Sequence, residues 1–184
     1  MARRLRPDAW VAGVQELTPE WLAERGIDTV LVDLDNTLAE WKAWQLPAGS
    51  VSWLDRLRSD GIRVCLLSNS RKPSRVRHLA DAHRLPYVAW AGKPRRGGFR
   101  RALAHLGAAS TDGVAMVGDQ LFTDIYGARR AGVYAVLVEP LSPREFAGTK
   151  LLRRFERWLL TRLGMRPPTS PDRGSEETED ADKG

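Results

Sequence analysis

Pairs of carboxylates follow two of the apolar segments of this chain. Asp33 and Asp35 stand two residues apart at the end of one apolar run, and Asp119 and Asp124 follow another. Clustered carboxylates supply the hard oxygen ligands that Mg²⁺ prefers, and the metal would offset their mutual repulsion. One carboxylate could then attack phosphorus, while a second acid two residues on exchanges protons with the leaving group and with water. A polar turn that begins with two acids is the alternative interpretation of the first pair.

Hydroxyl, amide and ammonium groups follow two further apolar segments. Ser68 and Asn69 come directly after residues 62–67, and Lys93 lies just beyond residues 87–90. A lysine ammonium and a serine hydroxyl can hold the oxygens of a phosphoryl group during its transfer. The chemistry requires that these side chains meet the four carboxylates in space, so it depends on the elements that carry them.

The apolar runs alternate with helical patterns along the chain. We predict strands at residues 29–33, 62–67, 87–90, 113–117 and 134–138, and helices at residues 18–26, 50–60, 73–84, 97–106 and 121–130. This alternation, with strands that are apolar almost throughout, predicts an α/β domain with a mostly parallel five-stranded sheet and helices on both faces. Because ligands bind at the carboxyl ends of the strands in such folds, the polar residues should converge along one edge.

Four ordered motifs then resemble those of the haloacid dehalogenase (HAD) superfamily phosphatases. They are Asp33-x-Asp35-x-Thr37, Ser68, Lys93 and Gly118-Asp119 with Asp124. The wider pattern, with Leu38, Trp41, Asn69 and Pro94, is similar to the YqeG-type subfamily (type IIIA) and to mitochondrial phosphatidylglycerophosphate phosphatases, from Pro7 to about Leu163. The resemblance implies a three-layer Rossmann-like fold and a Mg²⁺-dependent phosphomonoester hydrolase, with phosphatidylglycerophosphate as the preferred substrate.

The resemblance also implies roles for the acidic residues. Asp33 would be the nucleophile that forms an aspartyl-phosphate, and also a metal ligand. Asp35 would be the general acid/base and would bind the metal through its backbone carbonyl. Asp119 would complete the metal site, with Asp124 as a second ligand or an outer partner. Thr37 would support the first loop.

The remaining motif residues are expected to bind the substrate phosphate. The resemblance gives this role to Ser68, Asn69 and Lys93. Cap domains of the superfamily are inserted after the first or the second motif. Residues 38–67 and 71–92 have room only for the loop, helices and strands already predicted, so we expect no cap. An open site suits a macromolecular or membrane-borne substrate, or a substrate site that is completed by an oligomer.

The C-terminal part of the chain is expected to differ from the rest. Residues 150–163 have an apolar stripe and a basic face, which is typical of a helix lying on an anionic bilayer and equally of a last helix covering the sheet. We predict one domain over residues 1–166. Residues 167–184 hold six acidic and two basic residues and no large apolar ones, which predicts a disordered acidic tail.

The overall composition leaves several partners open. The net charge is +6, and the charge outside the acidic tail would attract phosphate esters, nucleic acid or an acidic membrane. No apolar run approaches the roughly 18 residues of a membrane span. The single cysteine, Cys65, fits a reducing compartment, so we expect the cytoplasm, or the inner membrane face if the C-terminal helix binds lipid.

Two alternative functions are kept beside the lipid phosphatase. One is a phosphatase of a soluble metabolite or phosphoprotein. The other is a non-catalytic nucleic-acid-binding module, for which no motif is found.

Overall fold

The computed structural model describes residues 5–142, 158, 160–162, 164, 165, 167 and 168. Their core is one sheet of six parallel strands, in the spatial order β1-β6-β5-β2-β3-β4. The strands are β1 (Ala9–Val11), β2 (Thr29–Val32), β3 (Arg63–Leu67), β4 (Tyr87–Val88), β5 (Val114–Gly118) and β6 (Tyr134–Val138). The predicted parallel α/β architecture is confirmed, and all five expected strands are present.

The predicted number of five strands is one too few. The additional strand, β1, pairs with β6 at the edge of the sheet, and the Asp8 amide donates to the Ala135 carbonyl just before it. With three residues, β1 is too short to give a recognisable alternation. The expected strand at 87–90 is also shorter than predicted, because the chain turns at Trp90, whose φ is 50°.

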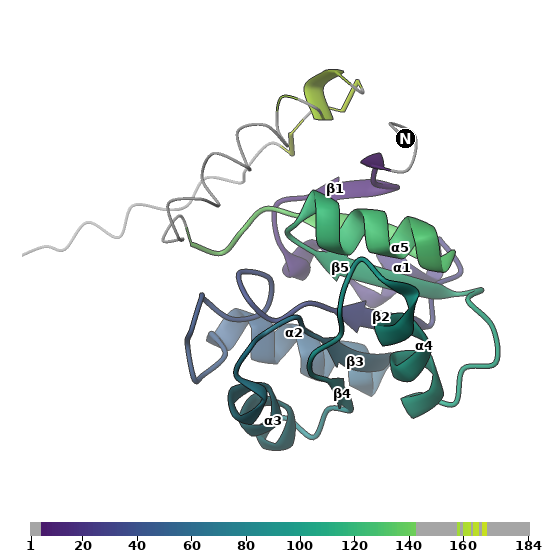
Figure 1. Ribbon diagram of the computed structural model, residues 1–184. Coiled ribbons are helices and arrows are strands. Elements are labelled where there is room, and N and C mark those ends of the chain that lie inside the picture. The colour runs from purple at the N-terminus through teal and green to yellow at the C-terminus, as the bar shows by residue number, and fades with distance from the viewer. Residues whose placement is uncertain (1–4, 143–157, 159, 163, 166, 169–184) are drawn as a thin grey trace, which may run out of the picture.

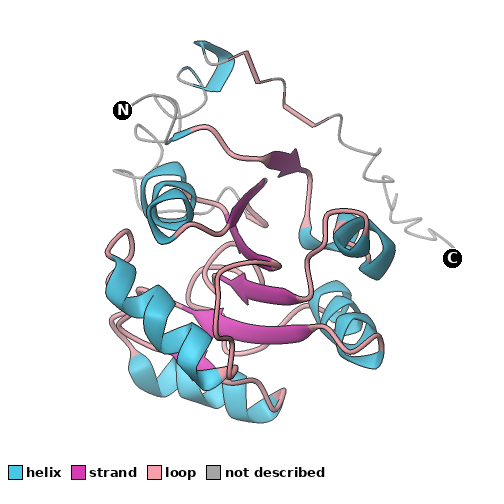
Figure 2. Ribbon diagram, turned by 90° about the vertical axis from the view of Figure 1, so that its right-hand side faces the viewer, coloured by secondary structure: helices cyan, strands magenta, loops and turns pink. Residues whose placement is uncertain are grey.

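Helices cover both faces of the sheet (Figures 1 and 2). One face packs against α1 (Pro19–Ala23), α2 (Ala48–Ser59) and α3 (Pro73–Ala82), and the other against α4 (Arg96–His105) and α5 (Tyr126–Ala131). Successive strand residues point to opposite faces, so Val30 and Val32 lie in the first core and Leu31 in the second. A π-helical turn, Leu121–Ile125, occupies the start of the helix predicted at 121–130.

The order of the strands fixes where a ligand can bind. The chain runs outward from β2 through β3 to β4, and from β5 through β6 in the opposite direction, so the order reverses between β2 and β5. A crevice opens at such a reversal, beyond the carboxyl ends of the two strands. Within residues 5–142 only a loop joins β2 to α2, and only α3 separates β3 from β4, so neither of these two segments contains an inserted cap domain.

Most of the predicted C-terminal helix at 150–163 and nearly all of the predicted tail at 167–184 lie outside the described residues. Trp158 and Leu160 are described, and both are helical. Leu160 is buried in the second core, whereas the Trp158 side chain is about half exposed. Among the residues that the structure describes, no helix is long and apolar enough to cross a bilayer.

The start of α4 gives a matched test of this packing. Gly98→Ala should lower the free energy of unfolding by about 2–3 kcal/mol, because the new Cβ would lie 2.3 Å from the Ala91 carbonyl oxygen. Gly97→Ala, one residue earlier, meets nothing within 4 Å and should be neutral or stabilising by up to about 1 kcal/mol. Urea unfolding of both variants measures the difference, and equal stabilities would contradict the close approach of α4 to the loop after β4.

Candidate active site

A pocket of about 410 Å³ opens at the carboxyl ends of the strands. It is lined by Asp33, Asp35, Asn36, Trp41, Lys42, Ser68, Asn69, Ser70, Arg71, Lys72, Arg75, Lys93, Gln120 and Thr123. The predicted nucleophile, acid/base and phosphate-binding residues are all in this set. The structure therefore brings together, at one edge of the sheet, side chains that the sequence distributes over 60 positions from Asp33 to Lys93.

Three carboxylates form a buried cluster, and one of them, Asp33, also lines this pocket. Asp33 follows β2, and Asp119 and Asp124 follow β5. Each offers an oxygen within 4.8 Å of the others, and each side chain is almost fully buried. A compact set of carboxylate oxygens fits a hard divalent cation, so these three residues could hold a metal ion. The Asp35 side chain lies outside this cluster, and its predicted metal contact through the backbone carbonyl stays a prediction.

Lys93 places a positive charge in the middle of the carboxylates. Its Nζ lies 2.5 Å from Asp33 Oδ1 and 2.7 Å from Asp124 Oδ1, with the ammonium group buried. Burial alone would lower the pKa of Lys93, but the carboxylates of Asp124 and Asp33 outweigh it and raise the pKa above its ordinary value. Lys93 therefore stays protonated, and its one charge pairs with two of the three carboxylates of the cluster.

The pKa of Asp33 is raised mainly by burial, and the neighbouring charges modify this shift. Burial raises it, the Lys93 ammonium lowers it, and Asp124 raises it again, which leaves the pKa at about 7 against an ordinary value of 3.8. A nucleophilic carboxylate must be ionised. A divalent cation held by the cluster would favour the ionised form, because it adds positive charge next to the carboxylates.

The position of Asp124 depends on a glycine and on the π-helical turn. A Cβ at Gly118 would lie 2.4 Å from the Asp124 carboxyl carbon, so only glycine at the end of β5 leaves room for that side chain. The backbone amide of Gln120 donates to Asp124 Oδ2 at 3.0 Å and fixes the position of the carboxylate. Thr37 Oγ1 makes a long contact of 3.5 Å with Asp119 Oδ1, which joins the loop after β2 to the end of β5.

The Asn69 side chain fixes the loop that carries Lys93. Asn69 Nδ2 donates to the Lys93 carbonyl, and Asn69 Oδ1 accepts from the Lys93 amide, both at 2.9 Å. Ser68 is buried at the end of β3, and its Oγ accepts from the Ser70 amide at 3.0 Å. Asn69 thus holds the backbone of Lys93 in place, and its direct contact with a phosphate stays a prediction.

A buried arginine contacts the second acid of the first motif. Arg75 Nη2 donates to Asp35 Oδ1 at 2.6 Å, and Arg75 Nε donates to the Ala43 carbonyl at 2.7 Å. The side chain of Arg75 is only 2% exposed, whereas that of Asp35 is 23% exposed. The sequence motifs do not include Arg75. Its only signal is its place in the first turn of the helix after the second motif.

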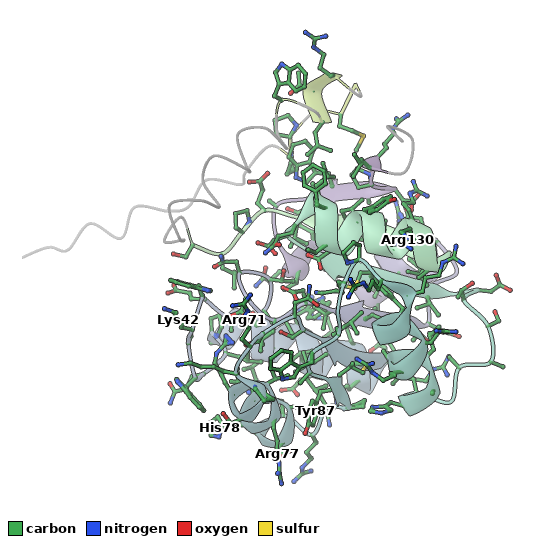
Figure 3. All side chains as sticks on the ribbon, in the orientation of Figure 1. Lys42, Arg71, Arg77, His78, Tyr87 and Arg130 are labelled. Atoms are coloured by element: carbon green, nitrogen blue, oxygen red, sulfur yellow. The ribbon has the colours of Figure 1, made fainter. Side chains whose placement is uncertain are left out.

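Tryptophan and basic side chains surround the mouth of the pocket. The loop of residues 40–47, which we call the entrance loop, carries Trp41 and Lys42, and Lys42 Nζ lies 3.9 Å above the Trp41 ring. Lys42 and Arg71 lie on the same side of the molecule (Figure 3) and both line the pocket, as does Lys72. The mouth is therefore positively charged and partly aromatic.

Known proteins with related sequences are hydrolases and phosphatases. The family model of the haloacid dehalogenase-like hydrolases matches residues 7–132. The chain is 33% identical to the "Probable phosphatase YqeG" of Bacillus subtilis (strain 168) over 157 residues, which covers 85% of this chain and 90% of that protein. It is 30% identical over 163 residues to the chloroplastic phosphatidylglycerophosphate phosphatase 1 of Chlamydomonas reinhardtii, and it spans 60% of the length of that relative.

A solved structure shares the fold. An uncharacterized protein from Listeria monocytogenes serotype 4b superimposes with a TM-score of 0.53, covering 65% of this chain and 85% of that chain at 18% identity. At this identity the likeness concerns the fold alone, and it agrees with the parallel sheet covered by helices on both faces.

The burial of Asp33 in the cluster predicts an unusual effect on stability. Because folding raises the pKa of Asp33 from 3.8 to about 7, the unfolded chain releases this proton at a lower pH than the folded chain does. The free energy of unfolding in EDTA should therefore fall as the pH rises from about 4 to about 7. Asp33→Asn removes this loss and should raise the melting temperature at pH 8 by roughly 5 °C.

Calorimetry in EDTA at pH 4 and pH 8 measures this effect. Asp35→Asn is the matched control, because Asp35 is partly exposed and paired with Arg75, and it should not raise the melting temperature. An equal change for Asp33→Asn at the two pH values would show that burial of the ionised Asp33 does not destabilise the fold.

Proposed function

The chain belongs to the haloacid dehalogenase-like hydrolases, and from this premise we propose that it is a Mg²⁺-dependent phosphomonoesterase that acts through an aspartyl-phosphate on Asp33. One observation carries the proposal: Asp33 lies at the end of β2, in contact with Lys93 and within the cluster completed by Asp119 and Asp124. The partly exposed Asp35 stands beside it in the same pocket.

Asp33, Asp119 and Asp124 would hold Mg²⁺, which neutralises phosphoryl oxygens so that an anionic carboxylate can approach an anionic ester. The Asp33 carboxylate attacks phosphorus, and the bond between phosphorus and the ester oxygen breaks. Asp35 gives its proton to the leaving oxygen. Lys93 and Ser68 hold the phosphoryl oxygens as charge shifts among them, and both are buried where such contacts are strong.

The second half of the reaction releases inorganic phosphate. Asp35, now ionised, takes a proton from a water molecule, and the resulting oxygen attacks the phosphorus of the aspartyl-phosphate. The bond between phosphorus and the Asp33 oxygen breaks, so Asp33 returns as a carboxylate and Asp35 as an acid. Asn69 contributes indirectly, because it fixes the backbone of Lys93.

The mouth of the pocket supports an anionic, lipid-borne substrate. Lys42, Arg71 and Lys72 line it and would attract a second negative charge close to the scissile phosphate. Trp41 is 41% exposed, and indoles favour the boundary between water and lipid. The similarity to a phosphatidylglycerophosphate phosphatase leads us to propose that lipid as the substrate, hydrolysed at the inner membrane face by a cytoplasmic enzyme.

The C-terminal segment contributes less to this lipid hypothesis. Leu160 is buried in the core, which favours packing of this turn on the sheet over insertion in a bilayer. The pocket mouth is therefore the better candidate for lipid contact. A soluble phosphate ester is the alternative, and the two substrates are separated by experiment below.

The catalytic proposal predicts magnesium-dependent release of phosphate from p-nitrophenyl phosphate. Asp33→Asn should lower kcat at least about 1,000-fold, because the amide cannot attack phosphorus. EDTA should abolish the activity, and Mg²⁺ should restore it. The matched control is Asp112→Asn, an exposed aspartate outside the pocket, which should keep wild-type activity. An Asp33→Asn variant that remains active would exclude the aspartyl-phosphate.

The lipid proposal predicts a preference set by the mouth. Wild type should cleave phosphatidylglycerophosphate in mixed micelles with a kcat/KM at least about tenfold above that for p-nitrophenyl phosphate. Replacing Lys42 and Arg71 by Gln should lower the kcat/KM for phosphatidylglycerophosphate about tenfold, and not more, because each lost charge is partly screened by water. The kcat/KM for p-nitrophenyl phosphate should stay unchanged. A matched control replaces two exposed arginines outside the pocket, Arg56 and Arg100, by Gln. Cleavage of the soluble ester alone would favour the soluble-substrate alternative.

A further inference from the structure

We propose that Arg75 is a positioning residue, which holds the carboxylate of Asp35 in the orientation needed for proton transfer and ties it to the entrance loop. The proposal rests on the function proposed above, in which Asp35 protonates the leaving oxygen. It adds to that function a residue which the four motifs do not include.

The geometry of Arg75 is that of a fixed fork. One nitrogen, Nη2, donates to Asp35 Oδ1, and a second, Nε, donates to the Ala43 carbonyl of the entrance loop. A planar guanidinium presents these donors in a rigid arrangement, so the carboxylate and the carbonyl are held at set positions relative to each other. A lysine ammonium at the end of a flexible chain would not impose that geometry.

Burial distinguishes Arg75 from the basic side chains at the mouth of the pocket. Its side chain is among the largest fully buried ones in the described residues, although it is charged. A buried cation is tolerated only when it is paired and hydrogen-bonded, and a buried pair is weak evidence of added stability. The other basic side chains of the pocket mouth do not share this burial: Arg71 and Lys72 are exposed.

The contact leaves Asp35 able to act. Arg75 contacts Oδ1, and the Asp35 side chain keeps 23% exposure toward the pocket, so Oδ2 can meet the ester oxygen. A carboxylate held by one oxygen loses the rotational freedom that would otherwise carry it away from the substrate. Such preorganisation contributes to rate because the reacting groups are already aligned.

The entrance loop is fastened to α3 at a second point. The ring of Trp44 meets the ring of His78 edge to face, with 5.5 Å between centroids, one helical turn beyond Arg75. The loop and the first turns of α3 therefore form one unit, and Arg75 connects that unit to the acid. This arrangement explains why a charged side chain is buried between the loop and the pocket.

The dependence of rate on the leaving group separates positioning from a merely structural role. Phenolate is a poorer leaving group than p-nitrophenolate and gains more from protonation. Arg75→Met should therefore lower kcat/KM about 100-fold for phenyl phosphate and less than tenfold for p-nitrophenyl phosphate. Arg75→Lys should fall between wild type and Arg75→Met. Arg77→Met, on the same helix, is the control. Arg77 is 71% exposed and points away from the pocket (Figure 3). The kcat/KM values of this variant for the two esters should therefore stay within about twofold of wild type.

A double-mutant cycle completes the test. In an Asp35→Asn background, Arg75→Met should cause no further change in the ratio of the two kcat/KM values, because the acid that Arg75 positions is gone. Equal losses on both esters, or a further change of the ratio in that background, would overturn the proposal. If Arg75→Met does not fold, Arg75→Lys carries the same comparison. Wild type that cleaves neither ester would instead refute the proposed function.

Discussion

The ion pairs of Lys93 with Asp33 and Asp124 are the interactions on which the rest of the site depends. Carboxylates at the ends of β2 and β5 are forced together by the parallel sheet, away from water, where unpaired charges are too costly to bury. The ammonium group that balances these carboxylates belongs to Lys93, which lies beyond β4 at the far edge of the sheet. The side-chain amide of Asn69 holds the backbone of Lys93 in place. Four strand ends are thus coupled through one charge, and Gly118 gives the space that this coupling needs.

The sequence predicts the centre of the fold better than its edges. Strands buried on both faces are apolar almost throughout, and this signal located the cores of β2, β3, β5 and β6. The edge strand β1 pairs on one side only and spans three residues, so its pattern is weak. Likewise no residue pattern predicts the π-helical turn, because the backbone amide of Gln120 can donate its hydrogen bond to the Asp124 carboxylate only once the end of β5 is in place.

The candidate site was predictable wherever a residue follows a strand directly. Asp33, Ser68 and Asp119 have that position, so the parallel topology alone brings them to one edge. Arg75 does not, because its burial is created by the entrance loop folding over the start of α3. In the sequence it is one of several basic residues of that segment, and nothing local separates the buried arginine from the exposed Arg77.

The same loop bears on how an uncapped enzyme selects its substrate. A mobile cap recognises the leaving group by closing over it, whereas this entrance loop is fastened to α3 through the Ala43 carbonyl and the Trp44 ring. Recognition is then limited to the phosphoryl group and to charges within reach of Lys42 and Arg71, and the rest of the substrate stays outside a pocket of about 410 Å³. Such a site discriminates weakly by size. This agrees with the proposed lipid substrate, whose acyl chains would be held by the bilayer and not by the pocket.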